Sequence, residues 1–170
     1  MNKRALQNVS LIAAIASCFM QIGAQLFAIA VVVRTAIAAP PRSFAIFEGE
    51  YGYDSSSFWQ IAPNITLVLI VAALIANWKT SRRYLLLASV VLFLVGGAMA
   101  ALVVEPGLED LIAVGYSDVV DPLLQSRAAT WYTYDWGLWL IALAAGIPLL
   151  VALARPATDG QMAPGGRRTT

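Results

Sequence analysis

The chain has 170 residues, of which 59% are hydrophobic and only 12% are charged, whereas a soluble domain usually carries roughly 25% charged residues. The net charge of +1 gives a nucleic-acid partner no basic surface to bind. Histidine is absent and Cys18 is the only cysteine, which removes the common ligands of haem, zinc and copper and excludes an intramolecular disulfide or a dithiol redox pair. We therefore predict no metal site and no cofactor.

Four apolar stretches without a charged residue follow one another along the chain: Val9–Val33, Ile61–Ala76, Tyr84–Val104 and Gly137–Ala154. Each is long enough, with its aromatic or polar flanks, to cross a hydrocarbon core of about 30 Å as a helix. Lipid offers the backbone no hydrogen-bond partner, so helices are favoured. The fold class predicted is all-α, a four-transmembrane-helix bundle over residues 1–155. A disordered cytoplasmic tail over 156–170 should follow, because this segment is rich in Gly, Thr and Pro.

Positive charge is sorted to one side of the predicted membrane. Eight of the eleven Lys and Arg residues precede the first span, fill the turn between spans two and three, or follow span four: Lys3, Arg4, Lys79, Arg82, Arg83, Arg155, Arg167 and Arg168. Nine of the ten acidic residues lie on the other side. The positive-inside rule places both termini in the cytoplasm, and we expect a multi-pass protein of a bacterial cytoplasmic (inner) membrane.

Two longer outer loops connect the spans, over residues 34–57 and 105–130. Glu105-Pro106-Gly107 is a typical helix-stop signal, and 108–114 and 119–124 are apolar enough for short helices that lie on the bundle. Near the N-terminus, residues 15–18 resemble a bacterial lipoprotein cleavage box. The apolar run nevertheless continues to Val33, which favours a retained helix.

Span one carries Ser10, Ser17, Gln21 and Gln25 on one narrow helical face that is otherwise lined by alanines. Two interpretations stay open for this face. It packs against a neighbouring helix, with glutamine amides that hydrogen-bond across the contact, or it forms the polar wall of a ligand pocket in the outer half of the bundle.

Span four carries Trp131, Asp135, Trp139, Ala142 and Gly146 on one face. The small residues on this face predict that it points into the bundle, which places Asp135 just below the outer membrane interface. An ionisable group at this depth is a functional-site hypothesis, with Asp135 as a catalytic base. The alternative is structural, because Trp and Tyr collect in an interfacial belt and Asp favours a helix N-terminus.

A buried carboxylate needs a partner. We expect Arg127 or Arg34 to form an ion pair with Asp135 or, failing both, Asn64 or Gln25 to bond with it. Asn64 is predicted near the depth of Asp135, on one face of span two with Gln60. If these faces point inward, a polar and aromatic ligand-binding pocket follows, lined by Gln21, Gln25, Gln60, Asn64, Trp131, Tyr132 and Trp139.

Three segments resemble the anthrone-oxygenase-like family of small four-helix membrane proteins, most of whose bacterial members have no known function. They are the turn Ala76-Asn77-Trp78-Lys79-Thr80-Ser81-Arg82-Arg83, the exit Val104-Glu105-Pro106 from span three, and the Trp131-containing approach to span four. The resemblance implies oxygenation of polycyclic phenolic substrates without a metal. In that family the last span tends to begin with Asn or His followed by Arg, where this chain has Asp135 and Trp136.

Two functions are therefore considered. The first is binding of a lipophilic small molecule, such as an aromatic one, in the outer half of the bundle, with oxygenase-type chemistry if Asp135 acts as a base. The second is a non-enzymatic accessory or scaffold subunit that packs against a membrane protein partner or another copy of the chain. The sequence leaves open whether the protein is an enzyme. The lipid bilayer is the one partner common to both functions, and neither involves nucleic acid.

Overall fold

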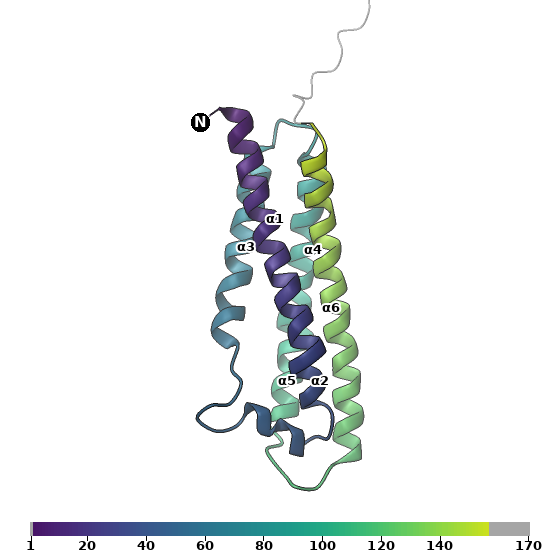
Figure 1. Cartoon of the computed structure of the whole chain (residues 1–170). Helices are drawn as coiled ribbons and strands as arrows, with labels where there is room; N and C mark the ends of the chain where they lie inside the picture. Colours follow the sequence, from purple (N-terminus) through teal and green to yellow (C-terminus); the bar gives the residue numbers. More distant parts are fainter. Residues whose placement is uncertain (1, 157–170) are drawn as a thin grey trace, which may run out of the picture.

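The computed structural model describes residues 2–156, which form helices joined by turns and loops without a β-sheet. Four long helices run alternately up and down: α1 (Lys3–Phe27), α3 (Ser56–Ala76), α4 (Arg83–Met99) and α6 (Pro122–Ala154) (Figure 1). Each belongs to a helical segment long and apolar enough to span a membrane. The predicted four-helix, multi-pass architecture is confirmed. The predicted disordered tail lies, apart from Pro156, outside the described residues.

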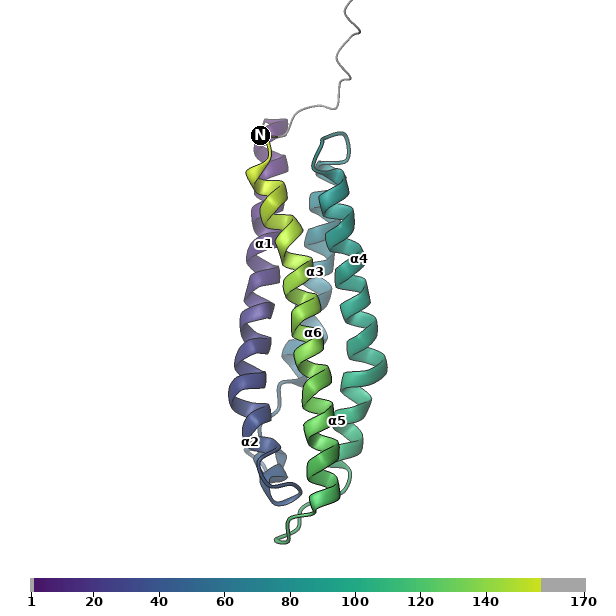
Figure 2. The same ribbon diagram turned by 90° about the vertical axis from the view of Figure 1, so that its right-hand side faces the viewer.

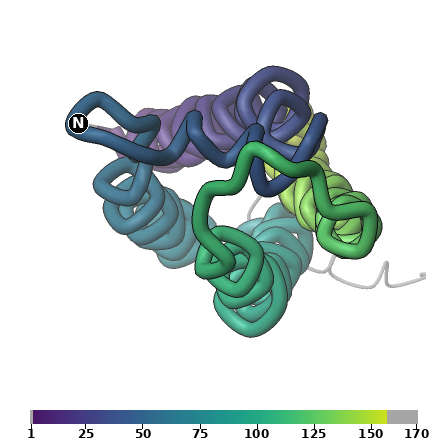
Figure 3. Tube along the Cα trace, turned by 90° about the horizontal axis from the view of Figure 1, so that it is seen from below, coloured from purple at the N-terminus to yellow at the C-terminus, as the bar shows by residue number. Residues whose placement is uncertain are grey.

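The four helices stand at the corners of a quadrilateral when the bundle is seen along its axis (Figure 3). α1 contacts α3 and α6, and α4 contacts the same two helices. α3 and α6 therefore face each other across one diagonal. Figure 2 shows how closely α6 runs between α1 and α4 along the bundle. The start of α1 and the end of α6 lie at the same end, as an even number of spans requires (Figure 1).

We call the half of the bundle next to the start of α1 and the end of α6 the inner half. Its core contains one large aliphatic side chain from each helix, fully buried: Leu11, Ile70, Leu86 and Leu149. The outside of the bundle is apolar as well, with residues such as Val68 and Leu140 more than half exposed. Such a surface is suited to hydrocarbon rather than to water. The interior and the outer surface of the bundle therefore differ more in how tightly their side chains pack than in their polarity.

Three of the helical segments continue well beyond the outer end of α3. α1 leads through a π-helix, η1 (Ala28–Val33), into α2 (Arg34–Ala36). α4 leads through a second π-helix, η3 (Ala100–Val104), into α5 (Glu105–Ile112). At 1.5 Å per residue α3 spans about 31 Å and α6 about 50 Å, so the outer ends rise about 20 Å above a bilayer matched to α3.

The predicted helix stop at Glu105-Pro106-Gly107 is wrong, because the helix continues to Ile112. Pro106 is accommodated at the start of α5, directly after η3, where the regular ladder of hydrogen bonds is already interrupted. The two separate short helices predicted for the second outer loop are not found either. Most of 108–114 belongs to α5, and 119–124 overlaps the start of α6, whose N-cap is Asp121.

The two outer loops contact each other over the outer end of the bundle (Figure 3). The first contains a 3₁₀ helix, η2 (Arg42–Phe47), from which Phe44 enters the outer apolar cluster. The buried members of this cluster are Val33, Ala36, Phe44, Val104, Leu111, Leu124, Ala128 and Trp131. The backbone N–H of Asp121 donates to the carbonyl of Pro40 at 3.0 Å, and Gln125 donates to Ala38 at 3.3 Å. These bonds tie the second loop and α6 to the first loop.

Candidate functional site

Asp135 is buried inside the bundle, with 7% of its surface exposed. Its partner comes from α1, where the Gln25 amide Nε2 donates to Asp135 Oδ1 at 3.4 Å. Neither Arg127 nor Arg34 pairs with this carboxylate in the described part of the chain, and both are exposed. The predicted inward phase of α6 is thus found, and the second choice of partner, Gln25, replaces the ion pair.

The two tryptophans on the same face of α6 donate their indole N–H groups to backbone carbonyls of neighbouring helices. Trp131 Nε1 donates to the carbonyl of Val104, the last residue of η3, at 2.8 Å. Trp139 Nε1 donates to the carbonyl of Ile22 in α1 at 3.1 Å. Both bonds satisfy a polar group that hydrocarbon could not. Through these bonds both tryptophans connect α6 to a neighbouring helix. Trp131 and Trp139 lie one turn before and one turn after Asp135.

Tyr132 and Trp136 complete this aromatic group. Their ring centroids are 6.2 Å apart in an edge-to-face arrangement, and Trp136 meets Trp139 in the same way at 5.7 Å. Tyr132 packs half-buried against the outer apolar cluster. The aromatic side chains therefore form a continuous edge along α6, as expected for residues at a membrane interface.

Gln21 bonds with α3. Its amide Nε2 donates to the carbonyl of Ala62 at 3.1 Å and to the hydroxyl of Thr66, and the Ser17 and Thr66 hydroxyls lie 2.6 Å apart. Of the two interpretations left open for this face of α1, the contacts favour polar packing against a neighbouring helix. Gln21 lies one turn further in than Gln25, and Gln25 is the residue that bonds with Asp135.

Gln60 and Asn64 do not join the predicted pocket. Both are exposed, and Asn64 Nδ2 donates to the backbone carbonyl of Gln60 within its own helix at 2.7 Å. The helical phase explains this, because Asn64 lies about 160° around α3 from the buried Thr66. The predicted depth also needs correction. Gln21 is level with Ala62, so Asn64 lies about 9 Å deeper than Gln25.

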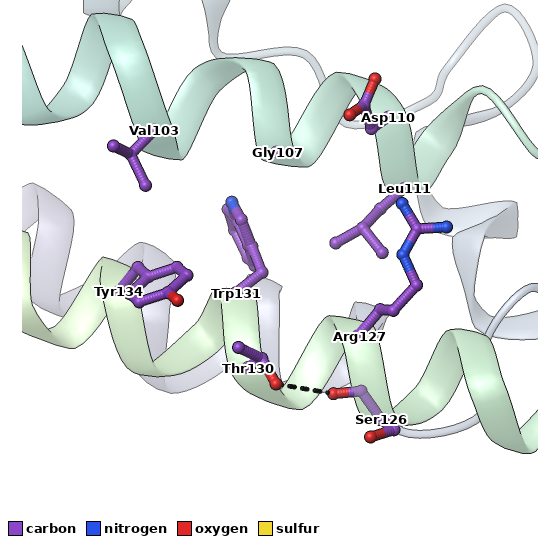
Figure 4. Close-up of a pocket in the computed structure, with 9 residues that line it drawn as sticks. All are labelled: Val103, Gly107, Asp110, Leu111, Ser126, Arg127, Thr130, Trp131 and Tyr134. Carbon is purple, nitrogen blue, oxygen red and sulfur yellow. Dashed lines mark hydrogen bonds between the residues drawn. The ribbon is translucent and has the colours of Figure 1, made fainter.

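A hollow of about 290 Å³ opens between α5 and α6, in the outer half of the molecule (Figure 4). Trp131 and Tyr134 lie along it on the α6 side, opposite Val103. Gly107 leaves the space that the Trp131 ring occupies, since a Cβ built on Gly107 would lie 2.7 Å from Cδ1 of that ring. The complete lining is Val103, Gly107, Asp110, Leu111, Ser126, Arg127, Thr130, Trp131 and Tyr134.

The polar residues of this hollow gather at its outer end. Asp110 from α5 and Arg127 from α6 line it there, and the guanidinium of Arg127 extends toward α5 (Figure 4). They are exposed and form no ion pair with each other within the described residues. Counting 20 residues outward from the inner ends of α4 and α6 puts Val103 and Tyr134 at the edge of the hydrocarbon. Asp110 and Arg127 then stand about 10 Å further out, at headgroup level.

Sequence reasoning found Trp131 and Arg127 but missed the other residues of this hollow. The signal was present on α6, where Arg127, Trp131 and Tyr134 follow the spacing of one helical face. It could not be used, because a helix expected to stop at Pro106 leaves no α5 for that face to oppose. A second hollow, of about 440 Å³, lies between α1 and α3 and is lined by Ser17, Met20, Ser57, Phe58, Ile61, Ala62 and Ile65.

Over residues 2–156 no group of three His, Cys, Asp or Glu side chains is placed to hold a metal ion. Cys18 is a buried free thiol in the core of the inner half. No family model matches the chain, and no curated protein or solved structure is similar enough to it to be detected. The candidate site therefore stands on its geometry alone.

Proposed function

We propose that the hollow between α5 and α6 binds a lipophilic small molecule that carries an aromatic ring and a polar group. The observation that carries the proposal is the order of the lining: apolar and aromatic side chains at the hydrocarbon edge, charged ones at headgroup level. A ring would stack against Trp131 and Tyr134, and its polar group would meet Asp110 and Arg127. Such a ligand would enter sideways from the outer leaflet of a bacterial cytoplasmic membrane.

The proposal is for binding alone. Asp135, the expected base, does not line this hollow and turns toward Gln25 on α1. An oxygenase-type reaction on a molecule held there would have no contact with that carboxylate. The Asp135–Gln25 pair supports the site indirectly, since it joins α1 to α6 one turn below Trp131.

Binding can be measured with 1-aminoanthracene, a lipophilic polycyclic amine, titrated into the full-length protein in lipid nanodiscs. The readout is the saturable fluorescence increase beyond that of empty nanodiscs. Thr130→Trp should fill the hollow and weaken binding at least about tenfold, a difference of 1.4 kcal/mol. Thr130 is exposed, and within residues 2–156 its hydroxyl bonds only with the Ser126 carbonyl of its own helix, so the fold should survive.

Thr133→Trp is the matched control. Thr133 is exposed on the same helix and makes the same kind of bond, to Ala129, but it does not line the hollow. Its binding should stay within about twofold of the natural protein, since no lining residue changes. Equal losses in both variants, or no saturable signal in the natural protein, would overturn the proposal.

A further inference from the structure

Asn64 is an exposed polar side chain at membrane depth. Asn64 lies eight residues from the outer end of the 21-residue helix α3, about 12 Å along its axis. It is exposed and points away from the buried residues Thr66 and Ile70. One amide hydrogen bonds with the Gln60 carbonyl. Within the described residues, its Oδ1 and second N–H have no partner.

Hydrocarbon cannot satisfy these two groups, and an unpaired amide there is costly. An interhelical hydrogen bond is the usual solution for Asn in a membrane helix. Within the described residues the bundle offers no such bond, because Asn64 lies on the side of α3 away from Thr66, which bonds with α1, and from Ile70, which packs in the core. The missing partner must therefore approach from the lipid side.

The exposed residues around Asn64 follow the spacing of a helix–helix seam. Ser57, Ile61, Asn64, Val68 and Ile75 succeed one another at intervals of four, three, four and seven, which is a heptad pattern. Ile61, Val68 and Ile75 are 59%, 66% and 71% exposed. β-branched residues along such a seam, with one Asn among them, favour a parallel pair of helices held in a single register.

We propose that α3 pairs with α3 of a second copy of this chain, with the two Asn64 amides bonded to each other across a twofold axis. All copies share one orientation in the membrane, so a dimer axis along the membrane normal brings identical residues together. A primary amide is both donor and acceptor, which makes Asn64 complementary to itself. The inner-half contacts of α3 with α1 and α4 lie on its other faces and are left intact.

Disulfide cross-linking in vesicles tests the register. The single native thiol, Cys18, is buried and is first removed by Cys18→Ser. With Asn64 intact, Ile61→Cys and Val68→Cys should each give a cross-linked dimer on mild oxidation. Leu140→Cys, which is 57% exposed on α6, should not. Equal cross-linking at Leu140, or none at either α3 position, would rule the interface out.

Energy transfer between copies fused to donor and acceptor fluorescent proteins tests the role of Asn64. In vesicles of rising protein-to-lipid ratio, Asn64→Leu should weaken association about tenfold. Thr133→Leu is the control, an exposed polar side chain on α6 that, like Asn64, bonds with a backbone carbonyl of its own helix. Asn64→Gln, which keeps the amide, should retain part of the association. An unchanged dimer in Asn64→Leu, or a natural protein that stays monomeric and so leaves this face to another membrane protein, refutes the pairing.

Discussion

The Asp135–Gln25 contact joins two side chains that lipid could not solvate, one from the first span and one from the last. Trp131 and Trp139 flank Asp135 on its face of α6, and their bonds with Val104 and Ile22 hold α6 against its neighbours on both sides of this contact. The carboxylate is held by an amide in place of the expected arginine. Such a pair fits a structural role, in which Asp135 is needed as the hydrogen-bond acceptor for the Gln25 amide.

Asp135→Asn should therefore be tolerated, because its carbonyl can still accept from Gln25. Asp135→Leu should lower the free energy of unfolding by about 1 kcal/mol, since the Gln25 amide loses its partner. Thermal unfolding in detergent measures both. In nanodiscs, Asp135→Asn should bind 1-aminoanthracene as the natural protein does. A loss of binding in this variant would make Asp135 part of the site and contradict the separation described above.

Single side chains were predictable only where their helix had one distinctive face. Gly146 and Ala142 marked the inner face of α6 and so placed Asp135 correctly. α3 offers no such mark, because Ile61 and Val68 face outward while Ile70 and Leu74 face inward. In a bilayer the outside is as apolar as the core, so hydrophobicity does not reveal which way Asn64 points.

At the scale of helices, Arg82 connects α1 and the end of α6 at the inner end of the bundle. Its side chain is buried, with 4% exposed. Its Nε and Nη2 donate to the carbonyl of Arg155 at the end of α6, at 2.9 and 2.6 Å, and its Nη1 donates to Asn8 of α1 at 2.8 Å. Burial lowers the pKa of the Arg82 guanidinium, yet arginine stays charged at neutral pH. Three elements thus meet on one cation.

Arg82→Ala should destabilise the protein by about 2–3 kcal/mol, because several charge-assisted bonds are lost together. Arg82→Lys should recover only part of this, since an ammonium lacks the planar fork. Arg83→Ala is the control, because Arg83 is exposed and, within the described residues, its side chain bonds only with the neighbouring Tyr84. The free energies come from reversible unfolding in mixed detergent. A similar change at both positions would show that the contacts of Arg82 contribute nothing of their own.

The middle of each predicted span was recoverable from hydrophobicity, but the outer ends were not. η1 and η3 carry their helices beyond the apolar runs, into segments rich in charged and turn-forming residues. Pro106 lies at the start of α5, directly after the π-helical turn η3, where the regular ladder of hydrogen bonds is already interrupted. The hollow between α5 and α6 depends on this extension, and no hydrophobic periodicity in the sequence predicts it.

For the whole molecule, the long axis has two unlike ends. The inner end is short and closed by the Arg82 contacts, while the outer end rises as a helical and looped cap over the bundle (Figure 1). Within residues 2–156, six of the nine cationic residues belong to the inner side and all nine acidic residues to the outer side. The fold fixes that both ends of the described chain share one side, and the charges predict that this side is the cytoplasm.

A reporter enzyme fused after Thr170 should therefore be active only if it works in the cytoplasm. The same reporter inserted at Ser117, in the exposed outer loop, should behave oppositely and serves as the matched control. Basic residues favour the cytoplasmic side of the membrane, so their removal weakens the preference for one orientation. Replacing Lys79 and Arg83 together by Gln should therefore raise the fraction of inverted molecules, while the buried Arg82 is kept. A periplasm-dependent reporter that is active after Thr170 in the natural chain would invert the orientation and put the hollow on the cytoplasmic leaflet.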